Sequence, residues 1–178
     1  MTTRQGRVNQ PTDGEPKERF VDFLEVVTGM QFAPLNYPMG RVVLIEDSAD
    51  YAFLVRRAFQ KSCPGEEILH FSHGTEALDF FANVPAGEEG EAAWLVLTDL
   101  QMPEVNGFQV LSALKSNPRF CDLPIIVLTT SDSPSDRARS FALGAQDFIT
   151  KPARIEDLRS TLKAVCGGFR GDEVVQSI

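Results

Sequence analysis

Trp94-Leu95-Val96-Leu97-Thr98-Asp99 is an apolar run that ends on a carboxylate, and the polar segment 100–107 follows it. Because apolar and polar residues do not alternate between 94 and 98, we predict a strand that is buried on both faces. Strands of this kind belong to parallel sheets, in which functional residues gather beyond the carboxyl ends of the strands. We therefore expect Asp99 to lie at the functional edge of a parallel sheet.

Three other predicted strands also run into polar residues, and their ranges are 41–45, 125–128 and 147–150. The polar residues that follow all four strands are, in chain order, Glu46, Asp47, Asp99, Thr129, Thr130, Ser131, Lys151 and Pro152. If the strands are parallel, their ends meet along one edge of the sheet. The sequence thus predicts one site that combines three carboxylates, a threonine hydroxyl and an ammonium group.

The residue types predict the chemistry of this site. Crowded carboxylates repel one another unless a cation lies between them, and a set of oxygen ligands without nitrogen suits Mg²⁺ or Mn²⁺. A hydroxyl and a lysine opposite the acids would bind the oxygens of a phosphoryl group. Since an aspartate carboxylate accepts phosphoryl groups as an acyl phosphate, we predict phosphorylation of Asp99.

Taken in chain order, these positions resemble the receiver domain of two-component response regulators, over residues 40 to about 166. The resemblance implies that Asp99 is the phosphoacceptor. It also implies that Mg²⁺ or Mn²⁺ is held by Glu46, Asp47, Asp99 and the backbone carbonyl of Gln101.

The same resemblance implies roles on the opposite side of the site. Thr129 would bind the phosphoryl oxygens, and Lys151 would pair first with Asp99 and then with the phosphoryl group. The bond between Lys151 and Pro152 looks like the cis-proline of the family, which would aim the ammonium into the site. Phe148 stands where the family more often has tyrosine, and would change rotamer in a switch that depends on Thr129.

A narrower resemblance is to small stand-alone receivers that work with phytochrome-type histidine kinases. It is carried by the segments 128–131 and 76–81 and by an acidic loop, 84–93, before the third strand. It implies a sensor histidine kinase, such as a phytochrome, as phosphoryl donor. Because we expect no effector domain, the output would be a contact with a downstream protein, in phytochrome-linked light signalling.

Strands alternate with helices about five times, which predicts an α/β, flavodoxin-like, doubly wound sheet of order 2-1-3-4-5. The first helix should be capped by Ser48 or Asp50 and bury Ala52, Val55, Ala58 and Phe59. The other helices are predicted over 75–83, 107–116, 133–143 and 155–166, and the second strand over 67–71. We divide the chain into an extension (1–39) with a short amphipathic helix, a receiver domain (40–166) and a tail (167–178) that begins at Gly167-Gly168.

Composition restricts the partners and the compartment. A net charge of -8 argues against binding to nucleic acid, and no apolar run is long enough to span a membrane. The three cysteines, Cys63, Cys121 and Cys166, show no C-x-x-C spacing, which is typical of inert thiols in a reducing cytoplasm. We interpret His70 and His73 as surface or loop residues, since their spacing across a strand end gives poor ligand geometry and no third ligand is nearby.

Two other functions compete with a phosphorylated receiver. A phosphohydrolase of the dehalogenase superfamily would carry a second aspartate two positions after the nucleophile, but Gln101 occupies that position, so we expect no enzyme. A degenerate receiver would act as an unphosphorylated scaffold. Such a scaffold has no need to keep three mutually repelling carboxylates together, so we favour phosphorylation.

We also predict a homodimer through the fourth helix, fifth strand and fifth helix, the face by which receivers commonly dimerise. Arg137 and Phe141 are four residues apart and so lie on one face of the fourth helix. If Ala138 and Ala142 face the sheet, Phe141 points outward beside Phe148. An exposed aromatic pair of this kind would mark the interface.

Overall fold

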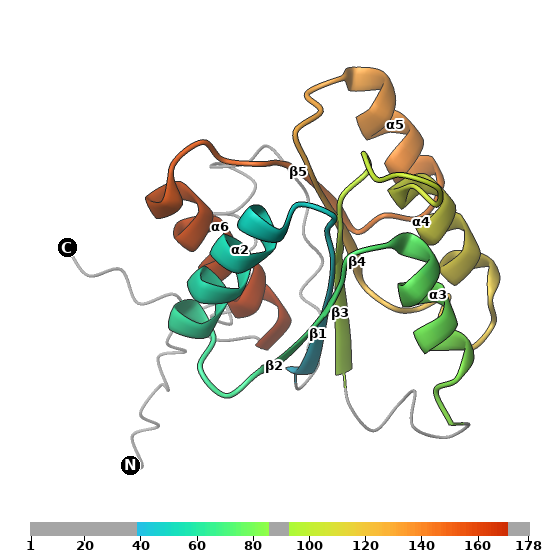
Figure 1. Cartoon of the computed structure of the whole chain (residues 1–178), viewed down its shortest axis with the longest axis horizontal. Coiled ribbons are helices and arrows are strands. Elements are labelled where there is room, and N and C mark those ends of the chain that lie inside the picture. The colour runs from blue at the N-terminus through green and yellow to red at the C-terminus, as the bar shows by residue number, and fades with distance from the viewer. Residues whose placement is uncertain (1–38, 86–92, 171–178) are drawn as a thin grey trace, which may run out of the picture.

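The computed structural model describes residues 39–85 and 93–170 (Figure 1). Its strands are β1 (Met39–Ile45), β2 (Glu67–Phe71), β3 (Ala93–Thr98), β4 (Ile125–Thr129) and β5 (Asp147–Thr150). Its helices are α2 (Ala49–Ser62), α3 (Gly74–Ala82), α4 (Gly107–Ser116), α5 (Pro134–Ala142) and α6 (Ile155–Arg170). The predicted helix in the N-terminal extension, the acidic residues 86–92 and the tail beyond residue 170 lie outside the described residues.

The strands form one parallel sheet in the order β2-β1-β3-β4-β5, which confirms the predicted fold class. In this sheet Ile45 is paired with Thr98, and Thr98 with Val127. The carboxyl ends of β1, β3 and β4 therefore lie nearly level. The polar residues that follow these strands are brought to one edge.

Each central strand supplies side chains to two cores, because successive residues of a strand point to opposite faces. Val42, Leu44, Leu95 and Leu97 face the helices α2 and α6, whereas Val43, Ile45 and Val96 face α3 and α4. Figure 1 shows α2 and α6 on one side of the sheet and α3, α4 and α5 on the other. Since all these strand residues are buried, the continuous apolar runs match a sheet covered on both faces.

Side-chain caps start the helices that border the site. The hydroxyl of Ser48 accepts a hydrogen bond from the backbone of Tyr51, which selects Ser48 from the two predicted caps of α2. Asn106 and Gln109 form a capping box at the start of α4. The predicted buried stripe of α2 is confirmed at all four positions, Ala52, Val55, Ala58 and Phe59.

The last helix is longer than predicted. We expected Gly167-Gly168 to end it near Cys166, but α6 continues to Arg170. A glycine in a helix interior costs only about 1 kcal/mol relative to alanine. Val165, Cys166 and Gly167 are all buried, so tertiary packing outweighs this local preference.

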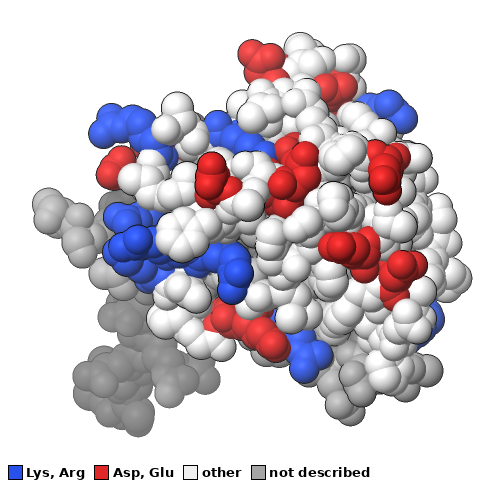
Figure 2. Space-filling model, viewed as in Figure 1, with Lys and Arg blue, Asp and Glu red and all other residues white. Residues whose placement is uncertain are grey.

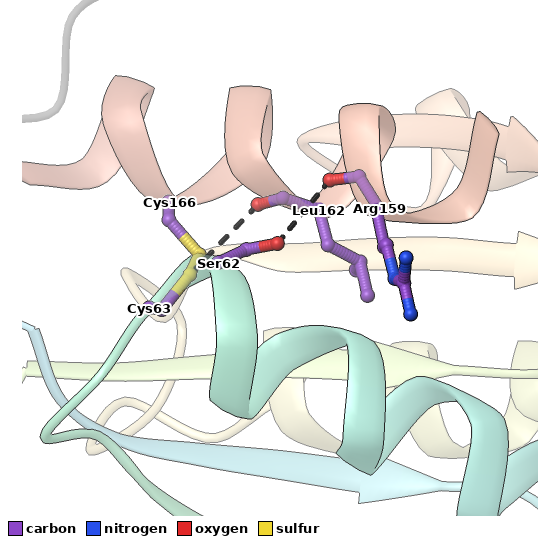
Figure 3. The surroundings of a disulfide bond; sticks show 5 residues. All are labelled: Ser62, Cys63, Arg159, Leu162 and Cys166. Carbon is purple, nitrogen blue, oxygen red and sulfur yellow. Dashed lines mark hydrogen bonds between the residues drawn. A yellow bond between two sulfur atoms is a disulfide. The ribbon is translucent and has the colours of Figure 1, made fainter. Parts of the chain in front are cut away.

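The prediction of three inert thiols is wrong for two of the cysteines. Cys63, at the end of α2, forms a disulfide with Cys166 of α6, and their Cα atoms are 6.3 Å apart (Figure 3). Beside it the hydroxyl of Ser62 donates to the carbonyl oxygen of Arg159 at 3.4 Å. The two cysteines are 103 residues apart, so only the packing of α2 against α6 reveals the pair. Cys121 is free.

Charge is unevenly distributed on the face that Figure 2 shows. Lys and Arg side chains are densest on the side where Figure 1 places α2 and α6, while Asp and Glu side chains are spread over the whole face. The exposed basic residues of α2 are Arg56, Arg57 and Lys61. The expectation that the protein does not bind nucleic acid stays a prediction. Within residues 39–85 and 93–170, no helix has the length and apolarity needed to cross a membrane.

Candidate functional site

Three carboxylates meet where β1 and β3 end. Glu46 and Asp99 are buried, with 1% and 4% of their surface exposed, while Asp47 is exposed. The backbone N–H of Asp99 donates to the carbonyl oxygen of Ile45 at 2.9 Å, which holds the two strand ends together. One oxygen from each of the three carboxylates lies within 4.8 Å of the others. The sheet thus assembles the predicted acidic cluster.

Lys151 lies between the two buried acids. Its Nζ donates to Oε1 of Glu46 at 2.9 Å and to Oδ2 of Asp99 at 2.6 Å. Only 8% of its side chain is exposed. An ammonium so close to two buried carboxylates offsets much of their mutual repulsion.

The peptide bond before Pro152 is trans, because no cis peptide bond occurs among the described residues. The predicted cis-proline is therefore wrong for this structure. A prolyl bond accepts either isomer at small cost, so the sequence alone cannot select one. The backbone N–H of Lys151 donates to the carbonyl oxygen of Thr129 at 2.6 Å, and with this trans bond the ammonium already reaches both acids.

The second oxygen of Asp99 is held by the loop that follows β3. Oδ1 accepts hydrogen bonds from the backbone N–H groups of Leu100, at 2.6 Å, and Gln101, at 3.2 Å. Gly107 lies directly against this loop, where an added Cβ would collide with the backbone oxygen of Asp99. The orientation of the Asp99 carboxylate is therefore fixed on both sides, by backbone donors and by Lys151.

Glu46 is anchored through both its backbone and its side chain. Its carbonyl oxygen accepts a hydrogen bond of 2.9 Å from Nε2 of His70, which must carry the proton because a carbonyl can only accept. His70 lies in β2 and is half-buried, and the expectation that it binds no metal stays a prediction. Burial raises the pKa of Glu46, and the Asp99 carboxylate adds to this effect, whereas Lys151 lowers the pKa.

The acidic cluster fits a divalent cation. Oε2 of Glu46 is buried and lies 2.7 Å from Nζ of Lys151, but among the described residues it has no hydrogen bond of suitable geometry. It therefore keeps lone pairs for a ligand. The donors are carboxylate oxygens, which Mg²⁺ and Mn²⁺ prefer. Gln101, the fourth predicted ligand, follows Asp99 by two residues and is exposed.

Two hydroxyl groups lie at the carboxyl end of β4. Thr129 is fully buried, and its Oγ1 accepts a hydrogen bond from the backbone N–H of Ser131 at 3.3 Å. The exposed Thr130 donates from Oγ1 to the side-chain oxygen of Gln101 at 3.1 Å. This hydrogen bond, which the sequence did not predict, links the loops after β3 and β4.

Tyr51 of α2 is the residue that sequence reasoning missed. Its ring centroid lies 4.6 Å from Nζ of Lys151, and its hydroxyl is buried without a hydrogen-bond partner in the described part of the chain. Burial raises the pKa of Tyr51, and the charges of Glu46 and Asp99 raise it further, so the phenol stays neutral. In the sequence, the one indication of this role was that Tyr51 follows the acidic residue Asp47 by only four positions.

Phe148 and Phe141 do not form the expected exposed pair. Phe148 is fully buried, and the guanidinium of Arg137 lies 4.7 Å from its ring centroid. Phe141 is 42% exposed. The alanines of α5 are exposed, and Ser140 is buried instead, since its hydroxyl donates to the carbonyl oxygen of Asp136 at 2.8 Å and so needs no water. Only Phe141 remains as an exposed aromatic residue of this helix.

Asp147 is the first residue of β5, and its titration should make the stability of the fold depend on pH. Burial raises its pKa to about 6, against the opposing effects of the Phe148 N–H and Arg137. Because the unfolded aspartate titrates near pH 4, the free energy of unfolding should fall as pH rises from about 4 to 6. Asp147→Asn should raise it by about 2 kcal/mol at pH 7.5 and leave it unchanged at pH 4.

Urea unfolding at both pH values checks this expectation, and Asp132→Asn at an exposed position is the matched control. An equal effect of Asp147→Asn at pH 4 and pH 7.5 would show that Asp147 does not titrate on folding.

A family model described as the response regulator receiver domain matches residues 42–163, which is more than half of the chain. The chain is 33% identical over 124 residues to the probable methanogenesis regulatory protein FilR2 of Methanothrix harundinacea, covering 70% of this chain and 79% of that protein. It is 29% identical over 128 residues to the response regulator Rcp1 of Synechocystis sp., and the alignment covers 72% of this chain and 87% of Rcp1.

Two of the solved structures that share the fold are those of response regulators. The phosphorylated cyanobacterial phytochrome response regulator RcpA matches with a TM-score of 0.66 and 27% identity, over 74% of this chain and 94% of that one. The Mn²⁺-bound form of Rcp1 matches with a TM-score of 0.63 and 27% identity, over 77% of this chain and 97% of that one.

Proposed function

The chain belongs to the response regulator receiver family, and on this premise we propose that it accepts a phosphoryl group from a histidine kinase on Asp99. The observation that carries the proposal is the geometry of Asp99, whose carboxylate is oriented by Leu100, Gln101 and Lys151. The phosphorylated protein would then signal through phosphorylation-dependent protein contacts. Receiver domains are divalent-metal-binding signalling modules, and the acidic cluster suits that chemistry.

The transfer itself is a substitution at phosphorus. A carboxylate oxygen of Asp99 attacks, an O–P bond forms, and the P–N bond to the donor histidine breaks. The electron pair leaves on the imidazole nitrogen, which takes up a proton. The hydroxyl proton of Thr129 is free to donate to a phosphoryl oxygen, since its Oγ1 already accepts from Ser131. The Nζ of Lys151 lies 2.6 Å from Oδ2 of Asp99 and would donate to an oxygen of the phosphoryl group after transfer.

Glu46, Asp47 and Asp99 would hold Mg²⁺ or Mn²⁺ together with the backbone carbonyl of Gln101. When bound, such an ion supplies positive charge that neutralises the acids and the phosphoryl oxygens. Rcp1, which shares the fold, has been solved in a Mn²⁺-bound form, and this similarity supports the assignment.

Incubation with acetyl phosphate and Mg²⁺ tests the proposal. Intact-mass spectrometry should show the addition of one phosphoryl group to the wild type, and a chelator should prevent it. Asp99→Asn should abolish the addition, because an amide is a far weaker nucleophile. Asp132→Asn changes an exposed aspartate and serves as the matched control. Undiminished labelling of Asp99→Asn would show that Asp99 is not the phosphoacceptor.

The similarity to RcpA, a cyanobacterial phytochrome response regulator, supports a phytochrome-type kinase as donor, in light signalling. We also propose a cytoplasmic location for the protein. Phosphotransfer from purified candidate kinases, phytochromes among them, tests the partner. An unphosphorylated scaffold is less well supported, because the site retains its oriented phosphoacceptor and all three acids. Turnover of an external substrate is also less well supported, because the Gln101 amide cannot act as a general acid.

We further propose a homodimer through α5, β5 and α6, with Phe141 as the exposed anchor and Arg137 beside it. Phe141→Asp should give a folded monomer in sedimentation analysis, since a desolvated carboxylate would oppose association. Phe53→Asp, at a residue of α2 that is 61% exposed, makes the same change on the other side of the sheet and should leave the dimer intact. A folded Phe141→Asp dimer would place the interface elsewhere.

A further inference from the structure

The ammonium of Lys151 is surrounded by three groups. Two are carboxylates, Glu46 and Asp99, and each accepts one hydrogen bond from Nζ. The third is the ring of Tyr51, whose centroid lies 4.6 Å from Nζ. This distance is well within the range over which a cation is attracted to an aromatic face. With 8% of the lysine side chain exposed, little water is left around the charge.

The Tyr51 side chain also packs partly against the core between α2 and the sheet. Packing alone does not explain why this residue carries a hydroxyl, because the group is buried and has no hydrogen-bond partner among the described residues. A buried, unpaired hydroxyl costs free energy that phenylalanine would avoid. The ring therefore makes the contact at the site, and among the described residues the hydroxyl makes no hydrogen bond.

We propose that Tyr51 is a positioning residue for phosphoryl transfer, whose ring holds the Lys151 ammonium at the phosphoacceptor. This inference rests on the proposed phosphorylation of Asp99. A cation–π contact has little directional preference compared with a hydrogen bond. The ring therefore keeps the ammonium covered while one of its hydrogen bonds passes from Asp99 to a phosphoryl oxygen. Without the ring, water would solvate the ammonium and weaken its hold on both partners.

Three variants of the full chain separate the ring from other effects. Tyr51→Leu removes the ring, and Tyr51→Phe removes only the hydroxyl. Phe53→Leu makes the same aromatic-to-leucine change two residues along α2, where the side chain is 61% exposed. With acetyl phosphate and saturating Mg²⁺, Tyr51→Leu should slow labelling by about twofold to thirtyfold, the range of a partly desolvated cation–π contact. Tyr51→Phe and Phe53→Leu should both be labelled at the rate of the wild type.

Proton NMR gives a readout that does not depend on activity. Ring current from Tyr51 should shift the ε-methylene protons of Lys151 upfield in the wild type and in Tyr51→Phe, and this shift should vanish in Tyr51→Leu. Absence of the upfield shift in the wild type would overturn the contact even if a variant failed to fold.

The two hypotheses fail in different ways. If the wild type takes up no phosphoryl group, the proposed function fails, while the NMR shift still tests the contact. If the wild type is labelled and Tyr51→Leu is labelled as fast, the positioning role is wrong. If Tyr51→Phe slows labelling as much as Tyr51→Leu, the hydroxyl is the operative group, and the role of the ring is also wrong.

Discussion

Removal of the Cys63–Cys166 disulfide should lower the free energy of unfolding by up to about 4.7 kcal/mol, the value of the chain-entropy model for a loop of about 100 residues. The bond closes a loop of 103 residues and so restricts the unfolded chain strongly. Urea unfolding of the Cys63→Ala/Cys166→Ala double variant measures the change. Cys121→Ala removes the free cysteine and is the control.

The same double variant should still accept phosphoryl groups. Glu46 and Asp47 precede α2 and Cys63 follows its last residue, so 14 residues of helix separate them by about 20 Å. Stability equal to that of the wild type under oxidising conditions would contradict a structural role for the disulfide. Loss of phosphorylation in a folded double variant would instead show that the two ends of α2 are coupled.

Lys151→Met should lower the free energy of unfolding by about 3 kcal/mol in the presence of a chelator. The substitution leaves Glu46 and Asp99 buried beside each other without a compensating charge, and breaking a buried ion pair from one side is costly. Mg²⁺ should then stabilise the variant more than the wild type, because the ammonium no longer competes for these two carboxylates.

Urea unfolding with chelator and with Mg²⁺ measures both effects. Lys163→Met removes an exposed lysine of α6 and controls for the change in net charge. If Mg²⁺ stabilised Lys151→Met no more than the wild type, the lysine and the cation would not share ligands.

The parts of the fold that depend on local periodicity were predictable. The uninterrupted apolar residues 42–45, 94–97 and 125–128 indicated strands covered on both faces. The order of the strands in the sheet came instead from the likeness of the alternating strands and helices to the flavodoxin-like fold. The acids, Thr129 and Lys151 were found because each directly follows a strand, so their meeting needs only a parallel sheet. The cap at Ser48 is likewise a local signal.

The misses share a different cause, since each depends on packing between distant segments. The Cys63–Cys166 bond requires the contact of α2 with α6, and the burial of Cys166 and Gly167 carries α6 beyond its glycines. On α5, alanines were expected to be the buried residues, but Ser140 satisfies its own hydroxyl and replaces them. Tyr51 was missed because an aromatic residue on a helix is ordinarily a core residue, and only the position of Lys151 shows its second contact.

The central claim is that Asp99 carries the phosphoryl group. Borohydride reduces an acyl phosphate of aspartate to homoserine, so the reaction marks the phosphorylated position permanently. After treatment with acetyl phosphate, Mg²⁺ and borohydride, peptide mass spectrometry should find homoserine at position 99 alone. Homoserine at position 47, or a phosphoryl group gained without homoserine anywhere, would contradict the claim.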